Sequence, residues 1–64
     1  MKLLHDFRHE NRWAQVFLVG KDFMIQCFKN QVYEGSRTIK GHSEMYAEDC
    51  AENYVLGIWD FEDD

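Results

Sequence analysis

Residues 12–40 constrain the fold more than any other part of the chain, because three apolar segments follow one another with very short connections. The turn signal GKD separates RWAQVFLV from FMIQCFK, and NQ separates FMIQCFK from VYEGSRTIK. Strands joined by such short turns pair as antiparallel hairpins. The pattern therefore predicts a three-stranded antiparallel sheet, with a bulge or bend at Gly35 in its third strand.

Residues 44–56, EMYAEDCAENYVL, have the end signals of an α-helix. Ser43 stands in the N-cap position and Gly57 in the C′ position. Ser43 also belongs to GHSEM, which opens like the G-x-S-x-G signature of a nucleophilic serine. Met45 replaces the second glycine, and a chain of 64 residues cannot build the large parallel sheet that such a serine needs. We therefore expect Ser43 to cap the helix.

The predicted fold is α+β, a three-stranded antiparallel sheet with one main C-terminal helix packed across it, in a single domain spanning residues 1–64. At about 100° per residue, one helix face collects small and apolar side chains that we expect to pack on the sheet. These are Tyr46, Ala47, Cys50, Ala51, Tyr54 and Val55. Large aromatic residues are expected to supply much of the core. They are Trp13, Phe17, Phe23, Phe28, Tyr33, Tyr46, Tyr54 and Trp59.

Each end of the chain fits two interpretations. Leu3, Leu4 and Phe7 have helical spacing, which predicts a short N-terminal helix, although an extended arm fits the same residues. After Gly57, the segment IWDF fits a short final strand or a segment that folds over the edge of the core. The last residues, 62–64, are acidic and are expected to be solvated.

The layout resembles that of the double-stranded-RNA-binding domain, whose elements follow the order α-β-β-β-α. The detailed resemblance lies in GHSEMYAEDCA, a helix opened by glycine and serine that carries Ala47 and Ala51. The resemblance implies that fold. The family places lysines at the start of this helix to meet RNA phosphates, whereas this chain has Glu44, Glu48 and Asp49 there. The resemblance therefore concerns the layout and not the RNA-binding residues.

Charge is divided unevenly along the chain. Residues 1–41 hold all seven lysines and arginines and four acids, a charge of +3, while residues 42–64 hold eight acids and a charge of −8. Such a molecule attracts a basic surface to one side and repels nucleic acid there. The longest apolar run, VFLV, is too short to cross a membrane. We expect Cys27 and Cys50 to be reduced and the protein to be cytoplasmic, in the host cytoplasm if a phage encodes it.

The acidic side of the helix is the predicted binding site. Glu44, Glu48 and Glu52 recur every four residues, a spacing at which like charges destabilise a helix by a few tenths of a kcal/mol per pair. No lysine or arginine in the helix offsets them. Two apolar residues project from the same side. The candidate partner-binding residues are Glu44, Met45, Glu48, Asp49, Glu52 and Leu56. The alternative is an ordinary solvated surface, whose negative charge serves solubility.

These observations predict a non-enzymatic protein-binding module, without a cofactor or metal, whose partner presents a basic surface. In size and charge the chain is similar to small phage host-takeover proteins, which cover the nucleic-acid-binding surface of a host enzyme. One alternative is RNA or nucleotide binding through Arg37, Lys40 and the helix N-terminus. Another is a metal site in which His5 and His9 lie on one helical face. A third ligand would then come from His42, Cys27 or Cys50.

Overall fold

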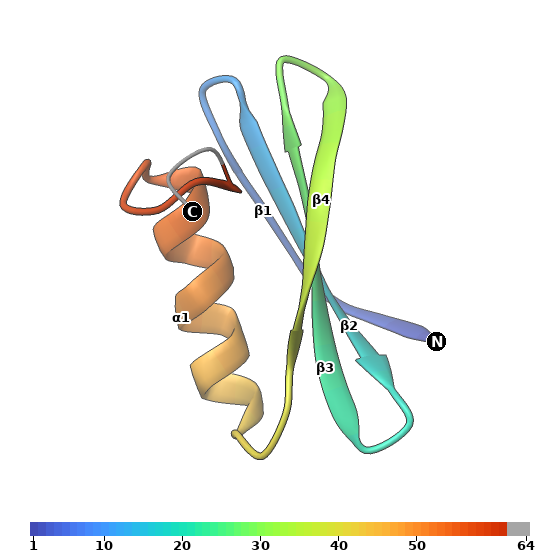
Figure 1. Ribbon diagram of the computed structural model, residues 1–64. Coiled ribbons are helices and arrows are strands. Elements are labelled where there is room, and N and C mark those ends of the chain that lie inside the picture. The colour runs from blue at the N-terminus through green and yellow to red at the C-terminus, as the bar shows by residue number, and fades with distance from the viewer. Residues whose placement is uncertain (62–64) are drawn as a thin grey trace.

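The computed structural model describes residues 1–61 and shows one antiparallel sheet with a helix along one of its faces (Figure 1). The strands are β1 (Lys2–His9), β2 (Arg12–Val19), β3 (Asp22–Lys29) and β4 (Val32–Ile39), and the helix is α1 (Glu44–Val55). The strands lie side by side in the order β1-β2-β3-β4. The predicted α+β class is therefore confirmed. The sheet has four strands and not three, and the chain begins with a strand where a helix was one of the two expectations.

Residues 2–9 form a strand and not the predicted helix. A bulge in this strand interrupts the alternation of side chains between the two faces, so the sequence does not show the usual strand pattern. Leu3 lies opposite Phe17, whereas His5 lies opposite Val16, so Leu4 is an extra residue in β1. The inserted residue places two leucines in succession, a pattern that looks helical in the sequence. Pairing with β1 also satisfies the backbone groups of β2, which would otherwise form an open sheet edge.

Two-residue turns at both ends of the sheet set the register of the strands. Asn30 and Gln31 between β3 and β4 have φ values of 54° and 66°, the left-handed conformation that a type I′ hairpin turn requires at both positions. The turn between β1 and β2 lies beside this one. The Asn30 N–H donates to the Asn11 carbonyl at 2.8 Å, and Asn11 Nδ2 donates to Asn30 Oδ1 at 3.0 Å. These hydrogen bonds join the tips of the two hairpins.

The predicted bulge at Gly35 is present in β4. Cys27 lies opposite Gly35 and Phe28 lies opposite Tyr33, so Glu34 is the additional residue. A Cβ atom at position 35 would lie 3.3 Å from Cε1 of Phe61. Glycine is therefore suited to this position, because it lets the aromatic ring approach the strand backbone closely.

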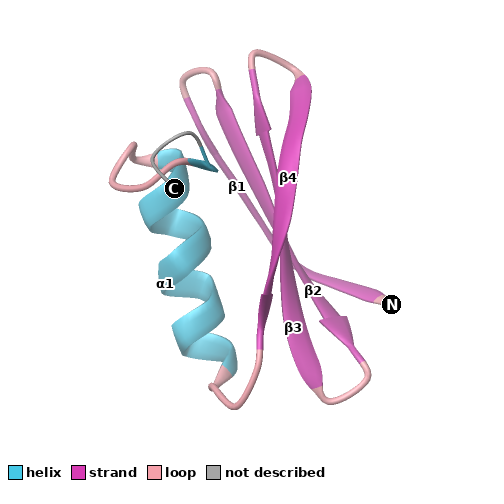
Figure 2. Ribbon diagram, in the orientation of Figure 1, coloured by secondary structure: helices cyan, strands magenta, loops and turns pink. Residues whose placement is uncertain are grey.

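The core lies between the sheet and α1, on one face of the sheet only (Figure 2). It is built mostly from small and β-branched side chains: Ala14, Val16, Ile25, Cys27, Ile39, Ala47, Ala51, Tyr54 and Val55. Both alanines of α1 are fully buried, which brings the helix close to the sheet. The predicted packing face of α1 is confirmed at Ala47, Ala51, Tyr54 and Val55, whereas Tyr46 is 45% exposed and stacks on His42.

The aromatic residues contribute less to the core than the sequence suggested. Among those expected there, Tyr54 is fully buried, and Phe23 and Trp59 are partly buried against the core. Four others face away from the helix, because their register partners alternate with those of the core residues. These four are Trp13, Phe17, Phe28 and Tyr33.

The segment after α1 folds back over the core, as one of the two expectations for it stated. Trp59 and Phe61 pack against the core, and the Trp59 indole N–H donates to the Cys50 carbonyl at 2.9 Å. Asp60 between them is buried. Residues 62–64, the predicted solvated tail, lie outside the described part of the chain.

Both cysteines are free thiols, as expected. Cys27 is fully buried in the core, and burial raises the pKa of its thiol from an ordinary value of 9.0 to about 12. Such a thiol stays protonated and unreactive near neutral pH, so Cys27 acts as a small core residue.

Candidate protein-binding site

Helix α1 carries the six predicted binding residues and is capped at both ends. The Ser43 hydroxyl accepts a hydrogen bond from the Tyr46 N–H at 3.2 Å, so the predicted N-cap is confirmed. At the other end, the Gly57 N–H donates to the Tyr54 carbonyl and the Ile58 N–H donates to the Asn53 carbonyl. These two bonds form a Schellman motif, with Gly57 at a φ of 84°. The helix therefore has a defined beginning and end.

Four of the six predicted residues form one exposed line on α1, which we call the acidic ridge: Met45, Asp49, Glu52 and Leu56. Their spacing of four, three and four residues follows one side of a helix. Met45 is 70% exposed and Leu56 is 53% exposed, and both acids between them are exposed. The ridge thus has an apolar residue at each end and two carboxylates in the middle.

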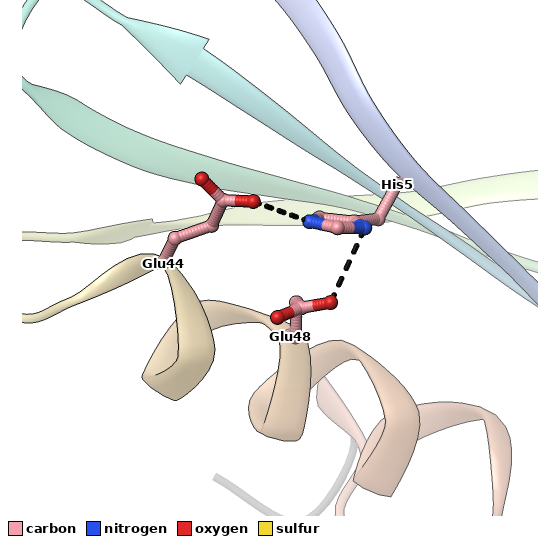
Figure 3. A group of neighbouring side chains, drawn as sticks. All are labelled: His5, Glu44 and Glu48. Atoms are coloured by element: carbon pink, nitrogen blue, oxygen red, sulfur yellow. Dashed lines mark hydrogen bonds and ion pairs between the residues drawn. The ribbon is translucent and has the colours of Figure 1, made fainter.

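The other two predicted residues contact His5 of β1 (Figure 3). His5 Nε2 lies 2.7 Å from Glu44 Oε2, and His5 Nδ1 lies 3.3 Å from Glu48 Oε1. A doubly protonated imidazole donates from both nitrogens, so a charged His5 binds both carboxylates at once. In its charged form His5 thus offsets the repulsion between Glu44 and Glu48. Sequence reasoning missed it because His5 had been considered as part of a helix.

His5, Glu44 and Glu48 are also the residues that come nearest to a metal site, since their donor atoms lie within 4.8 Å of one another. The two carboxylates approach opposite nitrogens of the imidazole ring. An ion bound at one nitrogen would have one carboxylate on the far side of the ring. The arrangement therefore suits an ion-paired histidine better than a metal centre.

The metal ligands considered from the sequence are not brought together. His5 and His9 lie four residues apart in a strand, which separates them by about 13 Å. His42 stacks on the Tyr46 ring, with ring centroids 3.8 Å apart, and Cys27 lies in the core. The pairing of His5 with His9 depended on a helix that the chain does not form.

The two cations considered for nucleotide binding have different environments. The Arg37 guanidinium lies over the Trp59 ring at 4.2 Å and near Phe61 at 5.8 Å, so it contacts the C-terminal segment. Lys40 is exposed in the connection between β4 and α1. Arg37 thus packs against its own chain.

A depression of about 410 Å³ lies between the two hairpin tips. Trp13 and Phe28 line it, together with Arg8 and the polar residues of the turns. Its aromatic wall belongs to the face of the sheet that α1 does not cover.

Comparison of the chain with protein-family models, with curated proteins and with solved structures gave no match.

Among the described residues, the structure contains no helix with the length and apolar character needed to cross a membrane.

Proposed function

We propose that the protein is a non-enzymatic protein-binding module whose acidic ridge docks on a basic surface of another protein. The observation that carries this proposal is the exposure of Met45 and Leu56 at the two ends of a line of carboxylates. Apolar anchors enclosed by charged residues are typical of protein interfaces, in which the anchors supply affinity and the charges supply orientation.

The charge of the helix supports a basic partner. Helix α1 contains four carboxylates and no lysine or arginine. His5 offers compensation to Glu44 and Glu48, but both lie to one side of the ridge. The ridge carboxylates Asp49 and Glu52 are exposed and make no hydrogen bond or ion pair among the described contacts, so they are available to cations of a partner.

An exposed helix of this kind suits a groove or a flat basic surface. A partner that binds nucleic acid presents such a surface, because its lysines and arginines are arranged for phosphates. A chain that covers this surface with carboxylates would compete with nucleic acid and so act as an inhibitor of the phage type.

The proposal is tested by charge reversal on the ridge. Asp49→Lys/Glu52→Lys should keep the fold, because both side chains are exposed, and should abolish binding, because like charges then face each other across the interface. Affinity capture from a bacterial lysate with quantitative mass spectrometry would identify proteins held by the wild type and released by this variant. Met45→Ala should weaken the same complexes, chiefly by faster dissociation.

The control is Glu10→Lys, which reverses one exposed carboxylate in the turn between β1 and β2, outside the ridge. It should retain every specifically captured protein. If Asp49→Lys/Glu52→Lys captures the same proteins in the same amounts as the wild type, the ridge is ordinary solvated surface. Salt-sensitive binding of RNA to the wild type would instead support the alternative based on Lys40 and the helix N-terminus.

A further inference from the structure

The face of the sheet opposite α1 has no described element packed on it, and we call it the open face (Figure 2). Strand register arranges its side chains in three rows that cross all four strands. The aliphatic row is Leu3, Phe17, Met24 and Thr38, the polar row is Asp6, Gln15, Gln26 and Ser36, and the aromatic row is Arg8, Trp13, Phe28 and Tyr33.

The aromatic row is continuous. The Arg8 guanidinium lies 4.1 Å from the centroid of the Trp13 ring, and the Trp13 and Phe28 rings stack with centroids 4.4 Å apart. The Tyr33 ring meets Phe28 edge to face at 5.6 Å. Because each ring is held by its neighbours, the surface is already ordered before any partner arrives, which lowers the entropic cost of binding.

The open face is too apolar for an ordinary solvated surface. Four of the ten aromatic residues of the chain lie on it, together with Leu3 and Met24. Tyr33 is 55% exposed and Leu3 is 48% exposed. The polar row separates two apolar rows, and an exposed apolar patch such as the aromatic row marks an interaction surface on many soluble proteins.

Charge decides which partner fits. The open face carries three charged side chains, Asp6 and Arg8 in its rows and Asp22 at its edge, and Arg8 Nε lies 3.5 Å from Asp6 Oδ1. Asp6 also accepts a hydrogen bond from the Trp13 indole N–H at 2.9 Å. The face is therefore nearly neutral. A polyanion would find few cations there, and a basic partner would be drawn to α1 instead.

We propose that a second copy of the chain covers the open face and that the two copies form a symmetric dimer. In this dimer each acidic helix lies on the outside, behind its own sheet. Packed sheets are about 10 Å apart, so the helices are separated by more than the Debye length of about 8 Å at physiological ionic strength. The net charge of −5 on each copy therefore opposes association only weakly.

Symmetry selects one arrangement of the two faces. A two-fold axis parallel to the strands places each row on the same row of the second copy, with β1 over β4 and β2 over β3. Asp6 then faces Ser36, Gln15 faces Gln26, and Arg8 faces Tyr33. An axis along the rows would instead place Asp6 against Asp6 of the second copy, where like charges repel each other.

The area of the face predicts a weak, reversible dimer. Four strands of eight residues give a plan area of about 500 Å² at the usual strand spacing and rise. Joining two such faces removes about 1,000 Å², near the lower limit for a specific interface. The dimer would display two acidic ridges on opposite sides, which allows it to bind two partner sites at once.

Sedimentation of the wild type between about 1 μM and about 1 mM tests the dimer. The mass should rise with concentration from 7.7 kDa towards twice this value. Gln26→Glu should stay monomeric, because each copy then places an unpaired carboxylate near the centre of the interface. Gln15→Lys should weaken the dimer less, because Asp6 of the same copy lies within reach of position 15. A mixture of the two variants should recover a heterodimer, since Lys at 15 in one copy then faces Glu at 26 in the other.

Glu52→Gln, which changes the charge by one unit on the far side of the molecule, is the matched control and should dimerise like the wild type. A wild type that remains monomeric at the highest concentration overturns the proposal. So does dimerisation of Gln26→Glu as strong as that of the wild type, and a mixture of the two variants that stays monomeric overturns the proposed two-fold axis. Should a variant fail to fold, nuclear magnetic resonance of the wild type on dilution gives the same test. Signals of Trp13 and Phe28 should then shift while those of α1 remain in place.

If the protein does not dimerise, the proposed role of the acidic ridge is unaffected, because the ridge lies on the other side of the molecule. The two proposals can therefore fail separately.

Discussion

Arg12 Nη2 lies 2.8 Å from Asp60 Oδ2 and so joins β2 to the segment that follows the helix. The other terminal nitrogen, Nη1, donates to the carbonyls of Tyr54 and Trp59 at 3.0 and 3.1 Å. Lys29 Nζ adds a contact to Asp60 at 3.4 Å. The Arg12 and Asp60 side chains are only 16% and 9% exposed. One guanidinium thus binds the end of α1 and the C-terminal segment to the sheet.

The first prediction concerns this ion pair. Asp60→Asn should lower the free energy of unfolding by about 3 kcal/mol, because it leaves the Arg12 charge buried without its carboxylate. Urea denaturation measures the loss. The control is Arg8→Gln, which removes the exposed contacts of Arg8 with Asp6 and with the Trp13 ring and should cost about 1 kcal/mol. Equal losses in the two variants would mean that the pair with Asp60 is no stronger than a surface contact.

The second prediction concerns His5 and Glu48. In a double-mutant cycle with His5→Gln and Glu48→Gln, the two side chains should show a favourable coupling of about 0.5 to 1 kcal/mol. The coupling should shrink as salt is added, because both groups are partly exposed. A cycle with His9→Gln in place of His5→Gln is the control and should show none. Zero coupling for His5 would show that the contact in Figure 3 does not stabilise the fold.

The third prediction concerns the N-cap of α1. Ser43→Ala should lower stability by about 1 kcal/mol, because the Tyr46 N–H loses its acceptor. Ser43→Asp should be tolerated, since a carboxylate accepts the same bond and favours the positive end of the helix dipole. Thermal denaturation compares the variants. A melting temperature for Ser43→Ala equal to that of the wild type would contradict the capping role.

The fourth prediction concerns alkaline pH. Burial raises the pKa of Cys27 from 9.0 to about 12, and burial followed by the nearby Cys27 raises the pKa of Tyr54 from 10.0 to about 12. Above about pH 9 the unfolded chain loses protons that the folded protein retains. The free energy of unfolding should therefore fall as pH rises towards 12, by about 1.4 kcal/mol per pH unit for each group within its own interval.

Urea unfolding at pH values from about 7 to about 11 measures this decline. These two groups contribute no change below pH 9, because both states hold the protons there. In Cys27→Ala the decline should begin about one pH unit later, when Tyr54 starts to titrate in the unfolded chain. The same onset in the variant and the wild type would show that the thiol is not responsible.

Local patterns in the sequence predicted β2, β3, β4 and α1, because each depends on neighbouring residues. Two-residue turns and alternating apolar positions indicated the hairpins, and Ser43 and Gly57 marked the ends of the helix. The bulge in β4 was also predicted locally, from the presence of a glycine at position 35. Strand β1 was not predicted, since a short helix and an extended arm were the two expectations for its residues. The extra residue Leu4 breaks the strand alternation, and only pairing with β2 compensates for that break.

Tertiary structure alone decided how distant residues meet. Asp60 contacts Arg12, which lies 48 positions away in the sequence, and Glu44 contacts His5, which lies 39 positions away. No local sequence pattern predicts contacts between residues so far apart. Helical periodicity placed six residues on one acidic side, yet only the docking of α1 beside β1 divided them into an exposed ridge and a histidine-bound pair. The aromatic row likewise depends on register, because one face of a sheet is defined only when all four strands are paired.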